Sequence, residues 1–467
     1  MRLLVVGGGI SGLTAAWAGA EAGFEVTVLE ASAQVGGKLR TATVGGVELD
    51  VGAESVLTTR PEALDLIAEL GLSGERIAPS TTAARIRAGG RSHPLPARTL
   101  LGIPTDVEAV QASGALSEGA VARLAAEPDR EPLAPLSDDV AVGALVRDRL
   151  GDEVVDRLVE PLLGGVYSGR ADQLSLRATV PTLAAALADG GSLLQAARGV
   201  VGAGTRPPSG SVFTSLRGGL GRLPAALAGS GRFAVRTSAT VRELTRTRAG
   251  FVLTVGAVPV AEHLEADAVV VALPAAKAAR LLRGLVPDAA RELGGIDSAS
   301  MAIVALAFDG VEAPAGSGLL VAAGERLAVK ALTLSTNKWP LESGTRTVLR
   351  ASVGRAGETT ALQLSDDDLV RLVRNELRPL AGIGADPVDA LVTRWGGGLP
   401  QYGVGHVERI GRVRDAVTRV PGLAVCGAAY DGVGVPACIA GARTAVRQVV
   451  TQLADRPRTP DRVDGGH

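Results

Sequence analysis

Three glycines close to the N-terminus constrain this chain more than any other feature of its sequence. They belong to the run Gly7-Gly8-Gly9-Ile10-Ser11-Gly12, which follows the apolar residues 3–6 and precedes helix-forming residues. The order of strand, glycine turn and helix is typical of a dinucleotide-binding unit. In such a unit Gly7 permits the tight turn, Gly9 lets the backbone approach a pyrophosphate, and Gly12 lets the helix pack on the strand. The helix start at Ile10 and Ser11 then presents free N–H groups to the phosphates.

The residues after this helix indicate which dinucleotide is bound. Residues 25–30 form a second apolar strand that ends in Glu30, where a ribose hydroxyl is held in such folds. Ala31 and the later Gly36-Gly37-Lys38 resemble the extended fingerprint of glutathione-reductase-like and amine-oxidase-like flavoproteins, which implies FAD rather than NAD. Gly37 allows close backbone approach, and Lys38 can offset phosphate charge. The alternative for Lys38 is a solvated loop lysine.

Composition excludes several classes of function. A chain of 467 residues is too long to fold around one hydrophobic core, so we expect more than one domain. Its 48 basic residues are balanced by 49 acidic ones, so it has no broad positively charged surface of the kind that binds nucleic acid. Two cysteines and four histidines are too few for a disulfide framework, and they do not have the spacing of zinc ligands. No uninterrupted apolar run reaches the length of a spanning helix, roughly 20 residues. We therefore expect a cytoplasmic protein with at most peripheral contact with a membrane.

The remaining sequence predicts an α/β fold with three parts. A Rossmann-like FAD-binding domain is followed by a mixed α+β substrate domain and an inserted helical region. The predicted FAD domain is discontinuous, at 1–56, 210–274 and 416–454; the substrate domain covers 57–75 and 275–415, the helical region 76–209, and a disordered tail 455–467. Gly52, Ala53, Glu54 and Ser55 follow an extended segment and are expected beside the flavin ring. Gly427 ends a late strand, before a glycine loop and another helix N-terminus that faces the cofactor.

Several segments in order resemble the protoporphyrinogen and coproporphyrinogen oxidases of haem biosynthesis, particularly the coproporphyrinogen III oxidases of Gram-positive bacteria, including actinobacteria. The matching segments are Val35–Thr41, Gly52–Leu57 with Arg60–Glu62, Glu160–Gly169 with Leu174–Arg177, Ser335–Pro340, Trp395, Pro400–Tyr402 with Gly405–His406, and Gly432–Pro436. The resemblance implies FAD-dependent oxidation of a porphyrinogen by O2 in three rounds, with release of H2O2. Coproporphyrinogen III is the expected substrate, and contact with a neighbouring haem-pathway enzyme for substrate transfer is a further expectation.

Other functions stay open on the sequence. Protoporphyrinogen IX is the alternative substrate. An amine oxidase or a carotenoid desaturase is the alternative flavoenzyme, although three tyrosines make an aromatic amine-binding cage hard to build. A protein that holds FAD or porphyrin without turnover is the alternative to an enzyme.

The same resemblance implies roles for single residues. Arg60 is expected to bind a substrate carboxylate, with a solvated arginine as the alternative. Val241 is expected at the adenine end, through its backbone. Tyr167 either lines the substrate cavity or packs the helical region. Near the flavin we expect Trp395, Val433, Gly434 and Val435.

Two further residues are expected to have structural roles, and one position differs from the family pattern. Lys338 and His406 are interpreted as structural, and no general base is assigned. Ala53 stands where relatives often have proline, which leaves the rigidity of that loop open but not its binding role.

Overall fold

Five parallel strands form the sheet that carries the glycine turn. In the computed structural model, which describes residues 1–203 and 211–454, the order of this sheet is β12-β2-β1-β16-β22. The strands are β1 (Arg2–Val6), β2 (Glu25–Leu29), β12 (Ala234–Arg236), β16 (Ala268–Val271) and β22 (Leu423–Val425). All four residues of β16 are buried, because both faces of the sheet are covered. The predicted tail at 455–467 lies outside the described residues.

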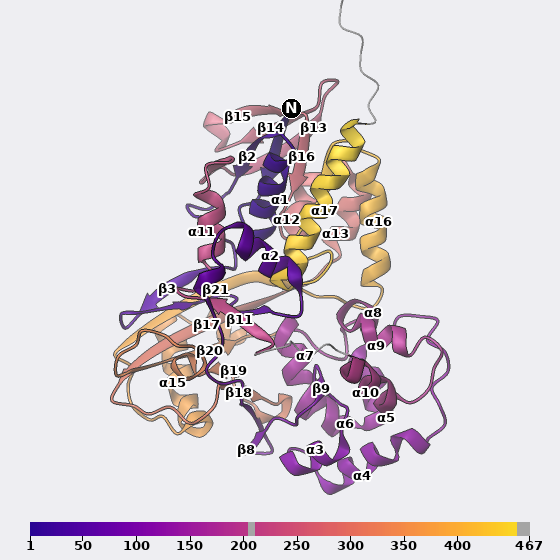
Figure 1. The fold of residues 1–467 in the computed structure, drawn as a ribbon, viewed down its shortest axis with the longest axis vertical. Coiled ribbons are helices and arrows are strands. Elements are labelled where there is room, and N and C mark those ends of the chain that lie inside the picture. The colour runs from indigo at the N-terminus through magenta and orange to yellow at the C-terminus, as the bar shows by residue number, and fades with distance from the viewer. Residues whose placement is uncertain (204–210, 455–467) are drawn as a thin grey trace, which may run out of the picture.

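Side chains alternate between two cores on either side of this sheet. Val270 packs with α1 (Ile10–Glu21), α2 (Pro61–Glu69), α11 (Arg222–Ala228) and α17 (Val435–Ala454). Its neighbour Val269 packs on the other face, against α12 (Ala275–Leu282), α13 (Pro287–Gly294), α16 (His406–Thr418) and a small antiparallel sheet. That small sheet consists of β13 (Val241–Arg246), β14 (Phe251–Val255) and β15 (Glu262–Ala266). Figure 1 shows α1 and α17 running side by side along the sheet.

A second, seven-stranded sheet forms the base of the substrate side. Its order is β21 (Asp389–Pro400), β17 (Ser298–Asp309), β20 (Arg346–Val353), β19 (Val329–Thr333), β18 (Gly318–Val321), β7 (Ala84–Ala88) and β8 (Arg91–Pro94). The β18–β7 pair is parallel and the others are antiparallel. Helix α15 (Asp366–Ala381) covers one face, and the hairpin β3 (Thr41–Val44) and β4 (Val47–Asp50) packs on the other.

A lobe of short helices packs around its own apolar core. The helices are α3 (Val107–Ser113), α4 (Glu118–Ala126), α5 (Val142–Leu150), α6 (Asp152–Val154), α7 (Glu160–Tyr167), α8 (Leu176–Thr179), α9 (Pro181–Ala186) and α10 (Leu193–Ala203), with a π-helical turn at Val155–Val159. Glu160 forms a buried ion pair at 3.0 Å with Arg355, which follows β20. This contact ties the lobe to the seven-stranded sheet. In Figure 1 the lobe lies opposite α15 and away from the N-terminus.

Short elements connect the three parts. They are the sheet β5 (Val56–Leu57), β11 (Phe213–Leu216) and β6 (Arg76–Ile77), the hairpin β9 (Thr99–Leu100) and β10 (Ile103–Pro104), and helix α14 (Ser335–Lys338). The predicted class, a parallel Rossmann-like sheet with a mixed substrate-side sheet, is confirmed. The domain boundaries stay a prediction, and β7 and β8 arise inside the segment predicted as helical.

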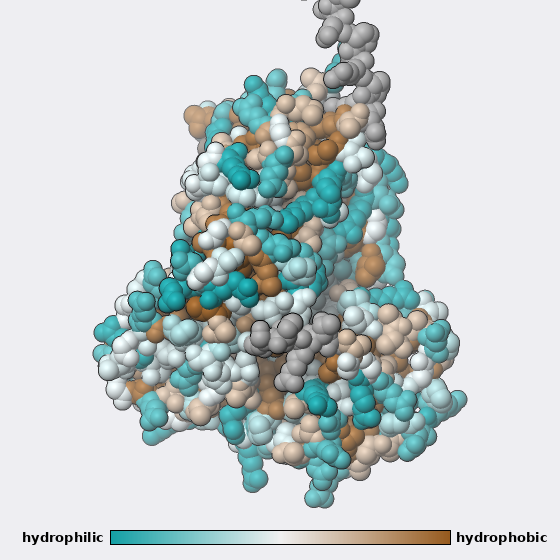
Figure 2. Space-filling model, viewed as in Figure 1, coloured by the Kyte–Doolittle hydropathy of each residue, from teal (hydrophilic) through white to brown (hydrophobic). Residues whose placement is uncertain are grey.

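No helix in the described part of the chain is long and apolar enough to cross a membrane. On the face that Figure 2 shows, hydrophilic side chains are spread over the helical lobe, and apolar atoms form scattered patches.

Candidate functional site

The glycine turn after β1 is closed on the protein side and open on the other. Gly7 has φ +110°, and a Cβ on it would lie 2.6 Å from the carbonyl oxygen of Ala272. A Cβ on Gly12 would lie 1.8 Å from the carbonyl oxygen of Gly7, so the turn and the helix touch there. At Gly9, by contrast, a Cβ would meet no atom of the described residues within 4 Å. Of these three glycines, Gly9 alone therefore leaves its backbone open among the described residues, beside the N-terminus of α1, where a pyrophosphate would approach.

Glu30 is held at the end of β2 by the turn itself. Its Oε2 accepts a hydrogen bond from Gly8 N at 2.7 Å, and its Oε1 accepts from Ser32 N at 2.8 Å and Ser32 Oγ at 2.7 Å. A carboxylate has about four acceptor positions, so one remains for a ribose hydroxyl. The carbonyl oxygen of Glu30 accepts from Ala239 N at 2.8 Å. This bond brings the start of β13, at Val241, to the expected adenine end.

The second glycine pair packs on the first turn. Gly36 N donates to Gly8 O at 2.8 Å, and a Cβ on Gly37 would lie 3.3 Å from Gly9 Cα. Lys38 follows, half-buried, and loss of water lowers the pKa of its ammonium group. Among the described residues no carboxylate forms an ion pair with Lys38. A poorly hydrated cation without an acidic partner fits an anionic cofactor.

Loop 52–55 lies against Lys38 and Trp395. Ala53 N donates to Lys38 O at 3.0 Å, and the indole Nε1 of Trp395 donates to Val51 O at 3.0 Å. A Cβ on Gly52 would lie 2.0 Å from Lys38 O and 3.3 Å from Trp395 Cζ2. The structure thus joins the loop, Lys38 and Trp395, which the sequence predicts near the flavin.

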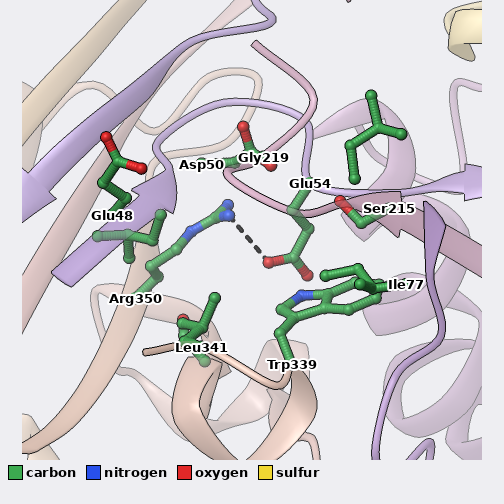
Figure 3. Close-up of a pocket in the computed structure, with 12 residues that line it drawn as sticks. Glu48, Asp50, Glu54, Ile77, Ser215, Gly219, Trp339, Leu341 and Arg350 are labelled. Carbon is green, nitrogen blue, oxygen red and sulfur yellow. Dashed lines mark hydrogen bonds and ion pairs between the residues drawn. The ribbon is translucent and has the colours of Figure 1, made fainter. Parts of the chain in front are cut away.

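The side chain of Glu54 forms ion pairs with two basic residues of the substrate side. Its carboxylate pairs with Lys338 at 2.5 Å and with Arg350 at 2.9 Å, as Figure 3 shows for Arg350. Burial alone raises the pKa of Glu54, but Arg350 and Lys338 together hold it below its ordinary value. Lys338 therefore has the structural role expected from the sequence, and any contact of Glu54 with a flavin uses backbone atoms.

A second helix N-terminus lies at the glycine turn. Gly427 (φ +135°) follows β22, and α17 begins at Val435, directly after Gly434. Burial raises the pKa of the Cys438 thiol, while a hydrogen bond with Ser11 and the nearby Lys38 ammonium oppose that shift. Both helix N-termini and Lys38 therefore converge at one place. Val433 packs on the helical lobe and joins this loop to it.

Three aromatic rings connect the helical lobe to the loop after β22. The rings of Tyr167 and Tyr402 lie 5.3 Å apart, and Tyr402 stacks on His406 at 3.9 Å. Tyr402 donates to Ala428 O at 2.5 Å, and His406 Nε2 lies 3.0 Å from Ala429 O. Burial raises the pKa of Tyr167 to about 12 and lowers that of His406 to about 4. Both side chains are thus neutral and packed.

Among the described residues, no hydrogen bond or cation–π contact joins Arg60 to these rings. It lies at the N-terminus of α2 with an exposed side chain, and its guanidinium pairs with Glu62 at 2.6 Å. Sequence reasoning gave no role to Arg350 or Tyr402. The scarcity of tyrosine is a signal that could have pointed to Tyr402, whereas nothing local distinguishes Arg350 among the many arginines.

Comparisons with known proteins agree with this geometry. The profile described as flavin containing amine oxidoreductase matches residues 10–450. The chain is 41% identical to the coproporphyrinogen III oxidase of Mycobacterium tuberculosis, over 96% of this chain and 97% of that protein, and 32% identical to that of Bacillus subtilis, over 97% and 98%. A crystal structure of an Exiguobacterium protein, assigned as a protoporphyrinogen oxidase, superposes with a TM-score of 0.85 at 33% identity, over 97% of this chain and 99% of that one. The chain therefore belongs to the flavin containing amine oxidoreductase family and, within it, to the group of the coproporphyrinogen III oxidases.

Proposed function

We propose that this chain oxidises coproporphyrinogen III to coproporphyrin III with FAD as its cofactor. Three rounds remove six hydrogens from the macrocycle, each round as a hydride and a proton, and three O2 are reduced to three H2O2. The observation that carries the proposal is the 41% identity, over 96% of this chain, to a protein named coproporphyrinogen III oxidase, on a chain whose Gly9 backbone is open to a pyrophosphate.

FAD, when bound, supplies the hydride acceptor and the route of electrons to O2. The residues of the chain bind and orient. Gly9 and the start of α1 hold the diphosphate, Glu30 takes a ribose hydroxyl through its free acceptor position, and Lys38 balances phosphate charge. We propose that the backbone of Val241 meets the adenine end, and that the backbone of loop 52–55, Trp395 and residues 433–435 surround the flavin.

Neither Tyr167 nor His406, the titratable groups at the junction of the lobe and the loop after β22, is a strong base for the proton. Tyr167, with a pKa of about 12, holds its own proton at neutral pH, and His406 is uncharged and bonded to a backbone carbonyl. We propose that the pyrrole N–H proton leaves to solvent or to a weak acceptor. The side chains then act by holding the macrocycle and excluding water.

Arg60 is proposed to bind a carboxylate of the substrate. Its guanidinium is exposed, and the partner it has, Glu62, lies two residues away on the same helix start. A substrate carboxylate can share or replace that partner, because a guanidinium offers five N–H donors. Tyr167 and Tyr402, at the junction of the helical lobe and the loop after β22, are proposed to support the cavity wall.

The proposal also covers where the substrate comes from and where the reaction takes place. We propose that a neighbouring haem-pathway enzyme transfers coproporphyrinogen to this protein. We also propose that the protein is cytoplasmic, with at most surface contact with a membrane.

The test compares kcat/KM for coproporphyrinogen III and protoporphyrinogen IX on the FAD-loaded protein. A clear preference for coproporphyrinogen is expected, whereas a preference for protoporphyrinogen would overturn the choice of substrate.

A further inference from the structure

A small cavity lies behind loop 52–55, between the FAD side and the seven-stranded sheet (Figure 3). It is lined by Glu48, Leu49, Asp50, Glu54, Ile77, Ser215, Leu216, Gly219, Ser335, Trp339, Leu341 and Arg350. Its volume is about 20 Å³. A water needs roughly 10–15 Å³ of such space, so the cavity has room for a water.

Ser335 Oγ and Arg350 Nε are buried at this cavity without a hydrogen-bond partner in the described part of the chain. The side chains of Asp50 and Trp339 lie beside them, Asp50 near the backbone of Gly221 and the Trp339 indole near the Glu54 carboxylate, whose pKa it lowers. The residues are only 1–8% exposed. Trp339 and Arg350 offer N–H donors, Asp50 offers an acceptor, and the serine hydroxyl can do either. A water in this space offers two donor and two acceptor positions to the unpaired serine hydroxyl and guanidinium N–H.

Arg350 also bonds directly to the flavin loop. Its Nη1 donates to Glu54 Oε2 at 2.9 Å, and its Nη2 donates to Gly52 O at 3.0 Å. One planar guanidinium therefore fixes both a backbone carbonyl and a carboxylate of the loop. Arg350 itself is fixed in β20, the third strand of the substrate-side sheet.

The FAD side is joined to the same network through Asp50. Its Oδ2 accepts from Leu220 N at 2.9 Å, just before α11, which packs on the core of the parallel sheet. Titratable groups that face Asp50 are Glu48 and Glu54 from its own segment and Arg350 from β20. Contacts from both sides of the molecule therefore meet at one guanidinium.

We propose that Arg350 is a positioning residue for the reaction. Through its bonds to Gly52 and Glu54 it fixes the flavin loop against the substrate-side sheet. This arrangement sets the separation of flavin and substrate. The inference rests on the proposed function, because it takes loop 52–55 as a flavin contact. An error of about 1 Å in such a separation costs about 100-fold in rate.

The test uses Arg350→Gln and Arg350→Lys, with Arg346→Gln as the matched control. Arg346 lies on the same strand, but its guanidinium pairs with Asp309 and donates to the carbonyl of Gly45, in the β3–β4 turn, and it has no bond to loop 52–55 among the described residues. Each FAD-loaded protein is mixed anaerobically with saturating coproporphyrinogen, and the rate of flavin reduction is followed. The reduced protein is then mixed with O2, and the rate of reoxidation is followed.

For Arg350→Gln we expect reduction to slow by about 100-fold, with the reoxidation rate and the substrate concentration for half-saturation nearly unchanged. Arg350→Lys is expected to recover part of the reduction rate, because an ammonium reaches one of the two loop acceptors. Arg346→Gln is expected to match the wild type. Unchanged reduction in Arg350→Gln, or equal slowing of both half-reactions, overturns the inference.

Trp339→Phe keeps the ring and removes the indole N–H beside the Glu54 carboxylate, which Arg350 also holds, so it decides the case in which the Arg350 variants do not fold. A partial slowing of reduction supports the inference, and a wild-type rate overturns it. If coproporphyrinogen does not reduce the wild type, the proposed function has failed. The flavin absorbance spectrum then tests the inference: it should shift in Arg350→Gln and not in Arg346→Gln, and no shift overturns it.

Discussion

We expect the substitution Gly9→Ala to weaken FAD binding while leaving the stability of the glycine turn nearly unchanged. Gly9 has φ −74° and ψ 177°, an extended conformation that alanine adopts without strain. A Cβ at this position meets no described atom within 4 Å. The cost to folding is therefore confined to a weaker helix N-cap, about 1 kcal/mol or less.

The cost to FAD binding is larger. The added methyl group occupies the space through which a pyrophosphate reaches the backbone. Loss of one hydrogen bond to a charged group costs about 1.5–3 kcal/mol, and each 1.4 kcal/mol is tenfold in affinity. We expect Gly9→Ala to weaken FAD binding by roughly 10- to 100-fold.

Gly12→Ala is the matched comparison. Its Cβ would lie 1.8 Å from Gly7 O, so the turn itself has to open, and both stability and FAD binding should fall. The assay titrates FAD into apoprotein, followed by protein fluorescence, and compares thermal unfolding of the two apoproteins by circular dichroism. Wild-type FAD affinity in Gly9→Ala, or a loss of stability in Gly9→Ala equal to that in Gly12→Ala, would refute the reasoning.

Three further predictions concern other parts of the site. Burial raises the pKa of Asp50 from 3.8 to about 7, so the folded protein holds this proton more tightly than the unfolded chain, and stability is lost as pH rises from about 4 to 7. Asp50→Asn should remove this loss of stability, which amounts to at most about 4 kcal/mol. The urea midpoint of Asp50→Asn should therefore exceed that of the wild type, and by more at pH 8 than at pH 5. Equal differences between the two midpoints at both pH values would contradict this prediction. Arg60→Gln should raise KM by about 10-fold with kcat unchanged and stability within about 0.5 kcal/mol, as measured by steady-state kinetics and melting; an unchanged KM rules out the proposed carboxylate contact. Tyr402→Phe leaves the carbonyl of Ala428 unpaired and should cost about 1–3 kcal/mol of stability in urea unfolding, whereas a neutral effect means that water replaces the hydroxyl.

Local features of the FAD site could be predicted from the sequence. The strand, the glycine turn and the helix are adjacent along the chain, and the contact that requires Gly12, against Gly7 O, lies within the same unit. Glu30 ends the next strand and reaches Gly8, a neighbour in space because β1 and β2 pair directly. Such short-range geometry leaves few alternatives.

Long-range contacts could not be predicted in the same way. The partners of Glu54, Lys338 and Arg350, lie 284 and 296 residues further along the chain. Only the packing of the substrate-side sheet on the flavin loop brings them together. Sequence reasoning therefore placed Glu54 beside the flavin without the cations that hold its carboxylate.

Short strands such as β7 could not be predicted from the sequence for a different reason. β7 has only five residues, with Ile86 and Ala88 buried, and this alternation is too brief to stand out from the surrounding helical pattern. It becomes a strand because β18 and β8 supply hydrogen bonds on its two sides. Pairing with distant chain, rather than local propensity, decides its structure.

Anaerobic mixing of the FAD-loaded protein with coproporphyrinogen III tests the central claim most directly. We expect the yellow flavin absorbance to bleach in a single turnover. Admission of O2 should restore the absorbance and yield three H2O2 for each coproporphyrin formed. A flavin that stays oxidised in the presence of excess coproporphyrinogen would contradict the proposed function.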